Sequence, residues 1–208
     1  MLIYYDWDFS PNCLKTKILL LELGIEFEQR SVEPKVLRGP EYRAIYPTGL
    51  VPAIEDGDLR LSESAAIALY LAEKYGALTP RDPRARALMF QALSIEAAIA
   101  GPTLGAFGLF GELYKPEAER NQPRIVELQG RAQRVAQILG AVLGDREYFA
   151  GAFSIADIQL YAGVAKSHES RVFEDPPKNL IAWCERMTAR PSVAKAREQY
   201  VLYRKQAG

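Results

Sequence analysis

Hydrophobic positions along the chain follow two different patterns, and the change between them falls close to residue 77. In the first part, short apolar runs at residues 2–5 and 27–32 are typical of buried strands. Between them, residues 11–23 repeat leucine and isoleucine close to the 3.6-residue period of a helix, which Gly24 ends. This order predicts a βαβ unit at the start of the chain.

The βαβ unit is followed by signals for a short helix at residues 40–45, a hairpin at 51–61, and a helix that stops at Gly76. Asp56-Gly57 separates the two apolar runs of the hairpin, and Asp-Gly is a strong signal for a two-residue turn. A βαβ unit followed by ββα is the order of a thioredoxin-like fold. This domain is expected to cover residues 1–76.

Residues 77–83 contain two prolines and are expected to form a linker. Beyond them strand signals nearly vanish, and residues 124–143 show the apolar repeat of one buried helical face. The residues on that face are Ile125, Leu128, Ala132, Val135, Leu139 and Val142. The predicted fold class is therefore α/β plus all-α, with a helical-bundle domain at residues 84–208.

The composition excludes several classes of function. The 208 residues carry a formal net charge of zero, so electrostatics give no reason to expect nucleic acid or a membrane surface as a partner. No apolar run approaches the roughly 20 residues of a membrane span, and the N-terminus lacks a signal-peptide pattern. Cys13, Cys184 and His168 are too few for a Cys/His-rich metal site or a disulfide scaffold, so no metal is expected. A cytoplasmic location fits best.

The stretch from residue 50 to 76 suits the binding of an extended, anionic peptide. Val51-Pro52 is a candidate cis bond, which would turn main-chain polar groups outward to pair with a peptide. Ser62-Glu63-Ser64 begins a helix whose free N–H groups and positive dipole end favour a carboxylate. One peptide could therefore lie along Val51 and place its carboxylate on Ser64.

Three motifs, in order, closely resemble those of the glutathione S-transferase superfamily. The first comprises V-P-A-I at residues 51–54, Asp56, S-E-S at 62–64, A-I at 66–67 and Y-L at 70–71. The second is F-S-I-A-D at 153–157, whose Ser154 and Asp157 are expected to form a helix capping box. The third is W-C-E-R-M-T-A-R-P-S-V at 183–193. The resemblance implies a thioredoxin-like domain that binds glutathione, a helical domain, and assembly as a homodimer.

A thioredoxin-like fold keeps its reactive group between the first strand and the first helix, where this chain has Ser10-Pro11-Asn12-Cys13. Redox members have Cys-Pro-x-Cys there, so a hydroxyl replaces the exposed thiol and the usual route to a mixed disulfide is lost. A serine can instead donate a hydrogen bond to the sulfur of bound glutathione, whose thiolate is the nucleophile. The resemblance makes Ser10 the expected catalytic residue.

Two neighbours of Ser10 are alternatives. Some bacterial relatives have T-P-N-G-x-K here, and this chain matches that pattern at its proline, asparagine and lysine, so Asn12 is a rival for the thiol contact. Serine and asparagine are also favoured helix caps without any catalysis. Cys13 is expected to be a small buried hydrophobe, and redox chemistry would become plausible only if it were exposed at the helix N-terminus.

The resemblance assigns the glutathione contacts to Lys35, Val51, Pro52, Glu63 and Ser64. Val51 would pair through its main chain, Glu63 with the ammonium group, and Ser64 with the γ-glutamyl carboxylate. Lys35 is a candidate partner of the glycine carboxylate, with a solvated surface lysine as the alternative.

A small apolar electrophile would bind between the domains, and the expected lining residues are Phe9, Phe107, Phe110 and Tyr114. Aromatic residues at this spacing also suit a core. The expected activity is transfer of the glutathione thiolate to that electrophile.

Two alternative functions remain. A glutathione-dependent disulfide or peroxide reductase is favoured if Asn12 or Cys13 dominates. A non-catalytic relative that binds no glutathione is favoured only by Tyr46 and Leu50, since many relatives have a polar side chain in place of Leu50.

Overall fold

The computed structural model describes residues 1–200, which form two compact units. Met1–Ala77 and residues 191–200 make the first unit, and Leu78–Arg190 makes the second. The expected helical domain runs from 84 to 208, whereas the last helix, α11 (Pro191–Gln199), belongs to the first unit. The reason is packing, because α11 lies against helix α1 (Pro11–Glu22) and buries Val193 and Ala196. Residues 201–208, which the sequence also assigns to the helical domain, lie outside the described residues.

The first unit is built on a mixed four-stranded sheet with strand order β2-β1-β3-β4. Its strands are β1 (Leu2–Asp6), β2 (Phe27–Ser31), β3 (Ala53–Asp56) and β4 (Leu59–Ser62). β1 pairs parallel with β2 and antiparallel with β3, which in turn pairs antiparallel with β4. This is the βαβ and ββα order of a thioredoxin-like domain, as predicted.

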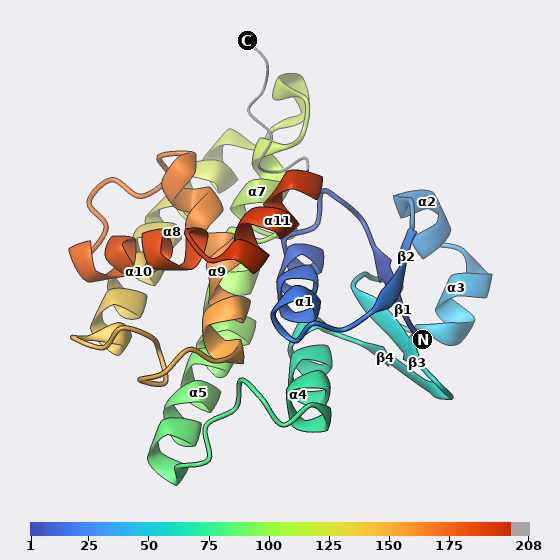
Figure 1. The fold of residues 1–208 in the computed structure, drawn as a ribbon. Helices are drawn as coiled ribbons and strands as arrows, with labels where there is room; N and C mark the ends of the chain where they lie inside the picture. The colour runs from blue at the N-terminus through green and yellow to red at the C-terminus, as the bar shows by residue number, and fades with distance from the viewer. Residues whose placement is uncertain (201–208) are drawn as a thin grey trace. The chain divides into compact units, whose positions relative to one another are not determined.

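Helices cover both faces of this sheet (Figure 1). On one side lie α1 and α4 (Ser64–Lys74), which pack against each other, and on the other lie α2 (Pro34–Leu37) and α3 (Pro40–Ile45). Alternate residues of β1 face the core, and Leu2, Tyr4 and Asp6 are all buried. The aspartate is unusual at such a position, because a buried carboxyl group needs hydrogen-bond partners.

The turns of the first unit agree with the sequence pattern. Asp56 pairs with Leu59, so Gly57 and Asp58 form a two-residue turn, and Gly57 has the positive φ of 65° that glycine adopts readily. The peptide bond between Val51 and Pro52 is cis, as expected.

The described part of the second unit is almost entirely helical. Its helices are α5 (Pro83–Ile95), η1 (Glu96–Ala100), α6 (Gly101–Leu104), α7 (Leu109–Leu113), η2 (Glu117–Glu119), α8 (Gln122–Leu143), α9 (Ile155–Glu169) and α10 (Lys178–Thr188). On α8, all the residues expected on the buried face are buried except Val142, which is half-buried beside the buried Leu143. The core helix is α9, which packs against α5, α6 and α10.

One segment corrects the expectation that no apolar run approaches a membrane span. Pro83–Leu113 is long and apolar enough to cross a membrane by length and composition, with a mean hydropathy of 1.4 over its best window. Buried core helices pass the same test, and 44% of that window is buried inside the protein. The segment is also divided into four helices, and α5 and α6 pack on α9. It has the packing of core helices.

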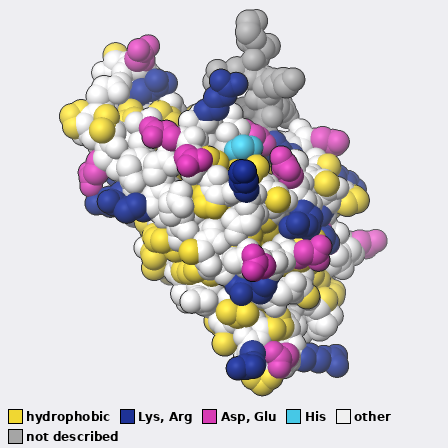
Figure 2. All heavy atoms as spheres, turned by 90° about the vertical axis from the view of Figure 1, so that its left-hand side faces the viewer, with side chains coloured by type: hydrophobic (Ala, Val, Ile, Leu, Met, Phe, Trp, Pro, Cys, Tyr) yellow, Lys and Arg dark blue, Asp and Glu magenta, His cyan; other side chains and the backbone are white. Residues whose placement is uncertain are grey.

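Charged side chains of both signs are mixed over the face seen in Figure 2, in keeping with the net charge of zero. That face offers no extended region of one charge to attract a polyanion.

The start of α9 is held by a fully buried carboxylate. Asp157 Oδ1 accepts hydrogen bonds from the Phe149 N–H at 3.0 Å and the Trp183 indole at 2.9 Å. Its Oδ2 accepts from the N–H and hydroxyl of Ser154, at 2.9 and 3.2 Å. This confirms the predicted capping box and extends it to a second helix. Burial raises the pKa of Asp157, whereas the four donors favour its ionised form.

We expect Asp157→Asn to lower the free energy of unfolding by about 2–4 kcal/mol, because the amide nitrogen would face donors in place of an acceptor. Urea denaturation followed by circular dichroism measures the loss. Trp183→Phe removes only one of the four donors and is expected to cost about 1–2 kcal/mol. Equal losses for both variants would contradict the central role of the carboxylate.

Candidate functional site

The N-cap residue of α1 carries a hydroxyl group that can act as a hydrogen-bond donor. Ser10 is the N-cap residue, with φ −91° and ψ 118°, and its Oγ accepts a hydrogen bond from the Cys13 N–H at 3.3 Å. The Ser10 N–H donates to the Trp7 carbonyl at 2.9 Å, which fixes the approach of the chain to the helix. Since a hydroxyl can accept and donate together, Ser10 caps the helix and can still donate its proton to a ligand.

Asn12 lies two residues further and differs from Ser10 in exposure. Its side chain is exposed, and its Oδ1 accepts a hydrogen bond from Lys15 Nζ at 2.8 Å. Its amide protons are thus turned away from that bond. The exposed amide group of Asn12 is thus accessible to a ligand.

Cys13 is fully buried, and burial is the largest cause that raises the pKa of its thiol to about 12. Hydrogen bonds with Ser10 and the Trp7 main chain act in the opposite direction and do not overcome the loss of solvation. The thiol therefore stays protonated near neutral pH. Cys184 is also buried, and neither cysteine forms a disulfide.

The sheet register gathers the expected peptide-binding residues at one edge. Ala53 is the first residue of β3 and pairs with Tyr5 of β1 and with Ser62 of β4. Continuing this antiparallel register by two residues places Val51 and Ser64 at the same end of the hairpin. The loop that follows β1 and carries Ser10 leaves the sheet at that end too. All three places therefore lie at the same end of the sheet.

Two features at this edge suit the binding of an extended, anionic peptide. Val51 and Pro52 precede β3, so the polar groups of Val51 lie outside the hydrogen-bonded ladder. Glu63 is exposed and has a positive φ of 74°, and Ser64, which is buried, begins α4. Glu63 makes no side-chain cap bond to α4. The positive φ is strained for a residue with a side chain, and strain of this kind concentrates at functional sites.

Lys35 follows β2 and is almost fully exposed. Its ammonium group lies 2.9 Å from the carboxylate of Glu33, which raises the pKa of Lys35 and lowers that of Glu33. An exposed pair of this kind is weak and can open to accept another anion.

The predicted electrophile residues belong to different units. Phe9, in the first unit, is partly exposed and its ring lies 5.3 Å from that of Trp7. In the second unit, Phe107 and Tyr114 are exposed, whereas Phe110 is buried. Their combination in one pocket stays a prediction.

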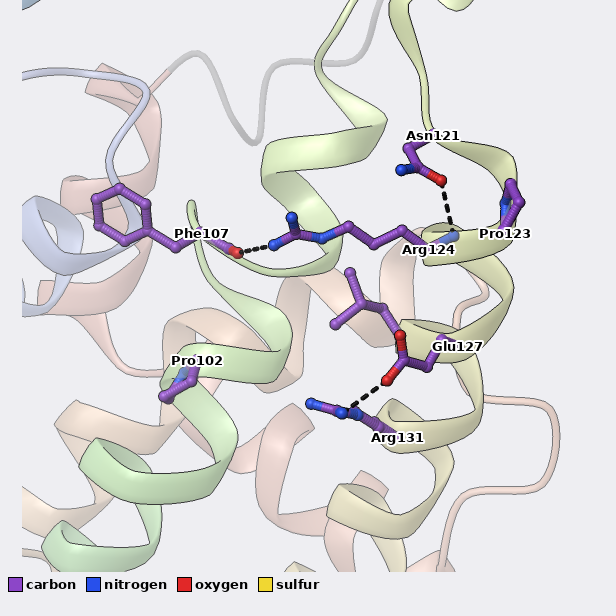
Figure 3. A pocket seen from close by; sticks show the side chains of 8 residues that line it. Pro102, Phe107, Asn121, Pro123, Arg124, Glu127 and Arg131 are labelled. Atoms are coloured by element: carbon purple, nitrogen blue, oxygen red, sulfur yellow. Dashed lines mark hydrogen bonds and ion pairs between the residues drawn. The ribbon is translucent and has the colours of Figure 1, made fainter.

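The second unit also contains a cavity of about 480 Å³, within the usual range for ligand pockets (Figure 3). It is lined by Pro102, Phe107, Asn121, Pro123, Arg124, Glu127, Leu128 and Arg131. Both arginines extend from α8 toward the segment that carries Phe107. Arg124 donates to the Phe107 carbonyl at 3.0 Å, and Arg131 donates to Glu127 at 2.6 Å.

Of the residues lining this cavity, the sequence pointed only to Phe107. The two arginines were missed, although their spacing of seven residues places them on the same side of α8. Among residues 1–200, no three His, Cys, Asp or Glu side chains cluster as a metal site would require.

Comparison with known sequences decides the family. Residues 5–81 match the sequence family described as glutathione S-transferase, N-terminal domain, and residues 106–191 match glutathione S-transferase, C-terminal domain. The chain is a member of the glutathione S-transferase superfamily. The sequence resemblance and its predicted fold class are thereby confirmed.

Individual superfamily members differ in their named activities. Glutathione S-transferase F10 of Arabidopsis thaliana is 31% identical over 89% of this chain and 91% of its own length. Disulfide-bond oxidoreductase YfcG of Escherichia coli is 30% identical over 92% and 93% of the two chains. The crystal structure of a Pseudomonas putida glutathione transferase, with one glutathione disulfide bound per subunit, has a TM-score of 0.84 and 27% identity over 94% and 90% of the chains.

Tyr46 and Leu50, which depart from the superfamily pattern before the cis proline, have structural roles in this protein. Tyr46 is buried and its hydroxyl donates to the Ile54 carbonyl at 3.2 Å. The Leu50 carbonyl accepts from Tyr42 at 3.0 Å, while its side chain is partly exposed. Both residues hold the segment that leads to Val51.

We expect Cys13→Ala to leave glutathione-dependent disulfide reduction unchanged within about twofold, because a buried thiol with a pKa of about 12 supplies almost no thiolate. Turnover of hydroxyethyl disulfide measures this. Cys184→Ala, which removes a buried thiol from the other unit, is the matched control. A large loss in the Cys13 variant alone would show that this thiol takes part in the reaction.

Proposed function

We propose that this protein is a glutathione transferase that ionises the thiol of bound glutathione at Ser10 and transfers the thiolate to a small apolar electrophile. The observation that carries the proposal is the Ser10 hydroxyl, which caps α1 by accepting a hydrogen bond, next to a Cys13 thiol that is sealed from solvent and stays protonated. The nucleophile then comes from the co-substrate and not from the protein.

The energies suffice for ionisation at neutral pH. A hydrogen bond to a charged group contributes about 1.5–3 kcal/mol, and the N-terminus of a helix adds about 0.3–1 kcal/mol. Since one pKa unit corresponds to about 1.36 kcal/mol, the thiol pKa of glutathione would fall by about 1–3 units from 8.5. The thiol proton would leave to solvent, and the thiolate would form the new carbon–sulfur bond as the leaving group departs with its electron pair.

The sheet edge supplies the remaining glutathione contacts in this proposal. Val51 pairs with the peptide main chain beside Pro52, Ser64 and the first turn of α4 hold the γ-glutamyl carboxylate, and Glu63 meets the ammonium group. Lys35 can leave Glu33 for the glycine carboxylate. Phe107 and Tyr114, which are exposed in the second unit, offer apolar surface for the electrophile. A cytoplasmic homodimer is part of the proposal.

A second candidate is glutathione-dependent disulfide reduction. The relative named as a disulfide-bond oxidoreductase and the exposed Asn12 support it. A glutathione thiolate would attack the substrate disulfide and release one thiol. A second glutathione would then resolve the mixed disulfide and leave glutathione disulfide. This route also needs no protein thiol.

The first test is titration with glutathione by calorimetry, with the ultraviolet absorbance of the thiolate followed against pH. Binding with a thiol pKa well below 8.5 is expected for the transferase. Binding without a pKa shift would favour the reductase, and absence of binding would favour a non-catalytic role.

We expect Ser10→Ala and Ser10→Gly to lower kcat for an aryl halide at least about tenfold while the Kd of glutathione stays within about threefold, because the lost hydrogen bond acts on the thiolate. Ser10→Thr keeps both the hydroxyl and the cap and is expected to retain activity. Glycine also caps helices acceptably, so its variant separates catalysis from capping. If Asn12→Ala caused the loss and Ser10→Ala did not, the thiol contact would belong to Asn12.

Ser64→Ala should act in the opposite way. It is expected to weaken glutathione binding about tenfold and leave kcat nearly unchanged, because the hydroxyl contacts a part of glutathione that does not react. Calorimetry and saturation kinetics measure the two effects. Ser62→Ala, at the end of β4, is the neighbouring control, and equal affinity in the two variants would show that the carboxylate binds elsewhere.

A further inference from the structure

A chain of three buried side chains lies beneath the first turn of α1. The hydroxyl oxygen of Tyr200, which follows α11, lies 2.9 Å from Asp6 Oδ2 and 2.9 Å from the hydroxyl oxygen of Tyr4. Tyr4 donates to the Cys13 carbonyl at 2.7 Å. None of the three side chains is more than 1% exposed. The chain connects the segment after α11 with the turn that carries Ser10.

Cys13 links this chain to the Ser10 hydroxyl. Its N–H donates to Ser10 Oγ, and its carbonyl accepts from Tyr4. The main chain of one residue is therefore held on one side by the candidate catalytic hydroxyl and on the other by a buried phenol. Any shift of the Cys13 peptide would move the N–H that orients Ser10.

Helix α11 is anchored at both ends of α1. At its start, Ser192 donates to Glu22, the last residue of α1, at 2.5 Å. At its end, Tyr200 reaches the network below the first turn of the same helix. The two helices thus run antiparallel in contact. The apolar residues of α11 account for packing, whereas the phenol places polar atoms in the core.

The number of protons shows why the Tyr200 oxygen matters. The contacts Asp6–Tyr200, Tyr200–Tyr4 and Tyr4–Cys13 are three, but two phenols supply only two protons. All three become hydrogen bonds only when the Asp6 carboxyl group also carries a proton. Asp6 then donates to Tyr200, Tyr200 to Tyr4, and Tyr4 to the Cys13 carbonyl. Asp6 has a further donor in Gln29 Nε2 at 2.8 Å, and Lys17 contacts Gln29 in turn. Without the Tyr200 hydroxyl, Asp6 loses a partner and Tyr4 loses its connection to Asp6.

We propose that Tyr200 is a positioning residue of the thiol site, and that its hydroxyl acts through Tyr4 and the Cys13 carbonyl to fix the turn that presents Ser10 to the glutathione sulfur. The inference rests on the proposed function for its catalytic consequence. Small displacements of a catalytic group have large effects on rate, so the rigidity of this turn matters more than its contribution to folding.

The test compares Tyr200→Phe with Tyr70→Phe. Tyr70 also donates to an aspartate of the first unit, Asp56, at 2.7 Å, so the control loses the same type of bond away from α1. The first readout is alkylation of Cys13 by iodoacetamide, located by peptide mass spectrometry, and it requires no glutathione. The second readout is the thiol pKa of bound glutathione, with its Kd measured in parallel.

For Tyr200→Phe we expect alkylation of Cys13 to be at least about fivefold faster and the glutathione thiol pKa to rise by about 0.5–1 unit, with Kd changed less than about twofold. Tyr70→Phe is expected to match the unsubstituted protein. Tyr4→Phe, which removes the bond to the Cys13 carbonyl directly, is expected to reproduce both changes and serves if Tyr200→Phe does not fold.

Unchanged alkylation and an unchanged thiol pKa in the Tyr200 and Tyr4 variants would overturn the inference, as would equal changes in Tyr70→Phe. Faster alkylation with an unchanged thiol pKa would overturn the catalytic part, since the turn would then move without affecting the sulfur. If the unsubstituted protein bound no glutathione, the proposed function would fail, while the alkylation rates would still decide whether Tyr200 holds the turn.

Discussion

The hydrogen bond from the Cys13 N–H to the Ser10 hydroxyl is the interaction on which the candidate site depends. It ends the loop after β1, begins α1, and directs the serine oxygen toward the N-terminus of that helix. Capping and thiolate stabilisation require the same position, where unpaired N–H groups and the helix dipole favour negative charge. The catalytic proposal therefore asks for no geometry beyond what the helix already needs.

The sheet register extends this local feature into a candidate binding site. The end of β1, the start of β3 and the end of β4 meet at one edge, so residues far apart in sequence come together without long loops. Within that edge, the cis bond at Pro52 and the positive φ of Glu63 give the backbone unusual directions. Irregular backbone at the edge of a regular sheet is the arrangement that lets an extended ligand pair with the protein.

Much of this could be predicted from the sequence, because it depends on local signals. The Asp56-Gly57 turn, the Ser154–Asp157 capping box and the burial of Cys13 follow from residue type and short spacing. The contacts that were missed join distant parts of the chain. Tyr200 lies 194 residues from Asp6, and no periodic pattern connects a terminal tyrosine with a strand aspartate. The assignment of α11 failed for the same reason, since a helical pattern does not specify which unit the helix packs on.

Burial explains why a thiol at Cys13 and a hydroxyl at Ser10 have such different chemical prospects. The thiol would have to lose a proton in a region without solvent, and its pKa rises to about 12 despite three hydrogen bonds, with Ser10, Trp7 and Tyr4, that favour the thiolate. The hydroxyl never ionises, and it needs only to donate to a charge that arrives on another molecule. The cost of forming that charge is lower at the helix end than in the core, because the donors there are already oriented. A fold that buries its own cysteine and places a capping serine at the start of a helix is therefore suited to activating a thiol that it does not contain.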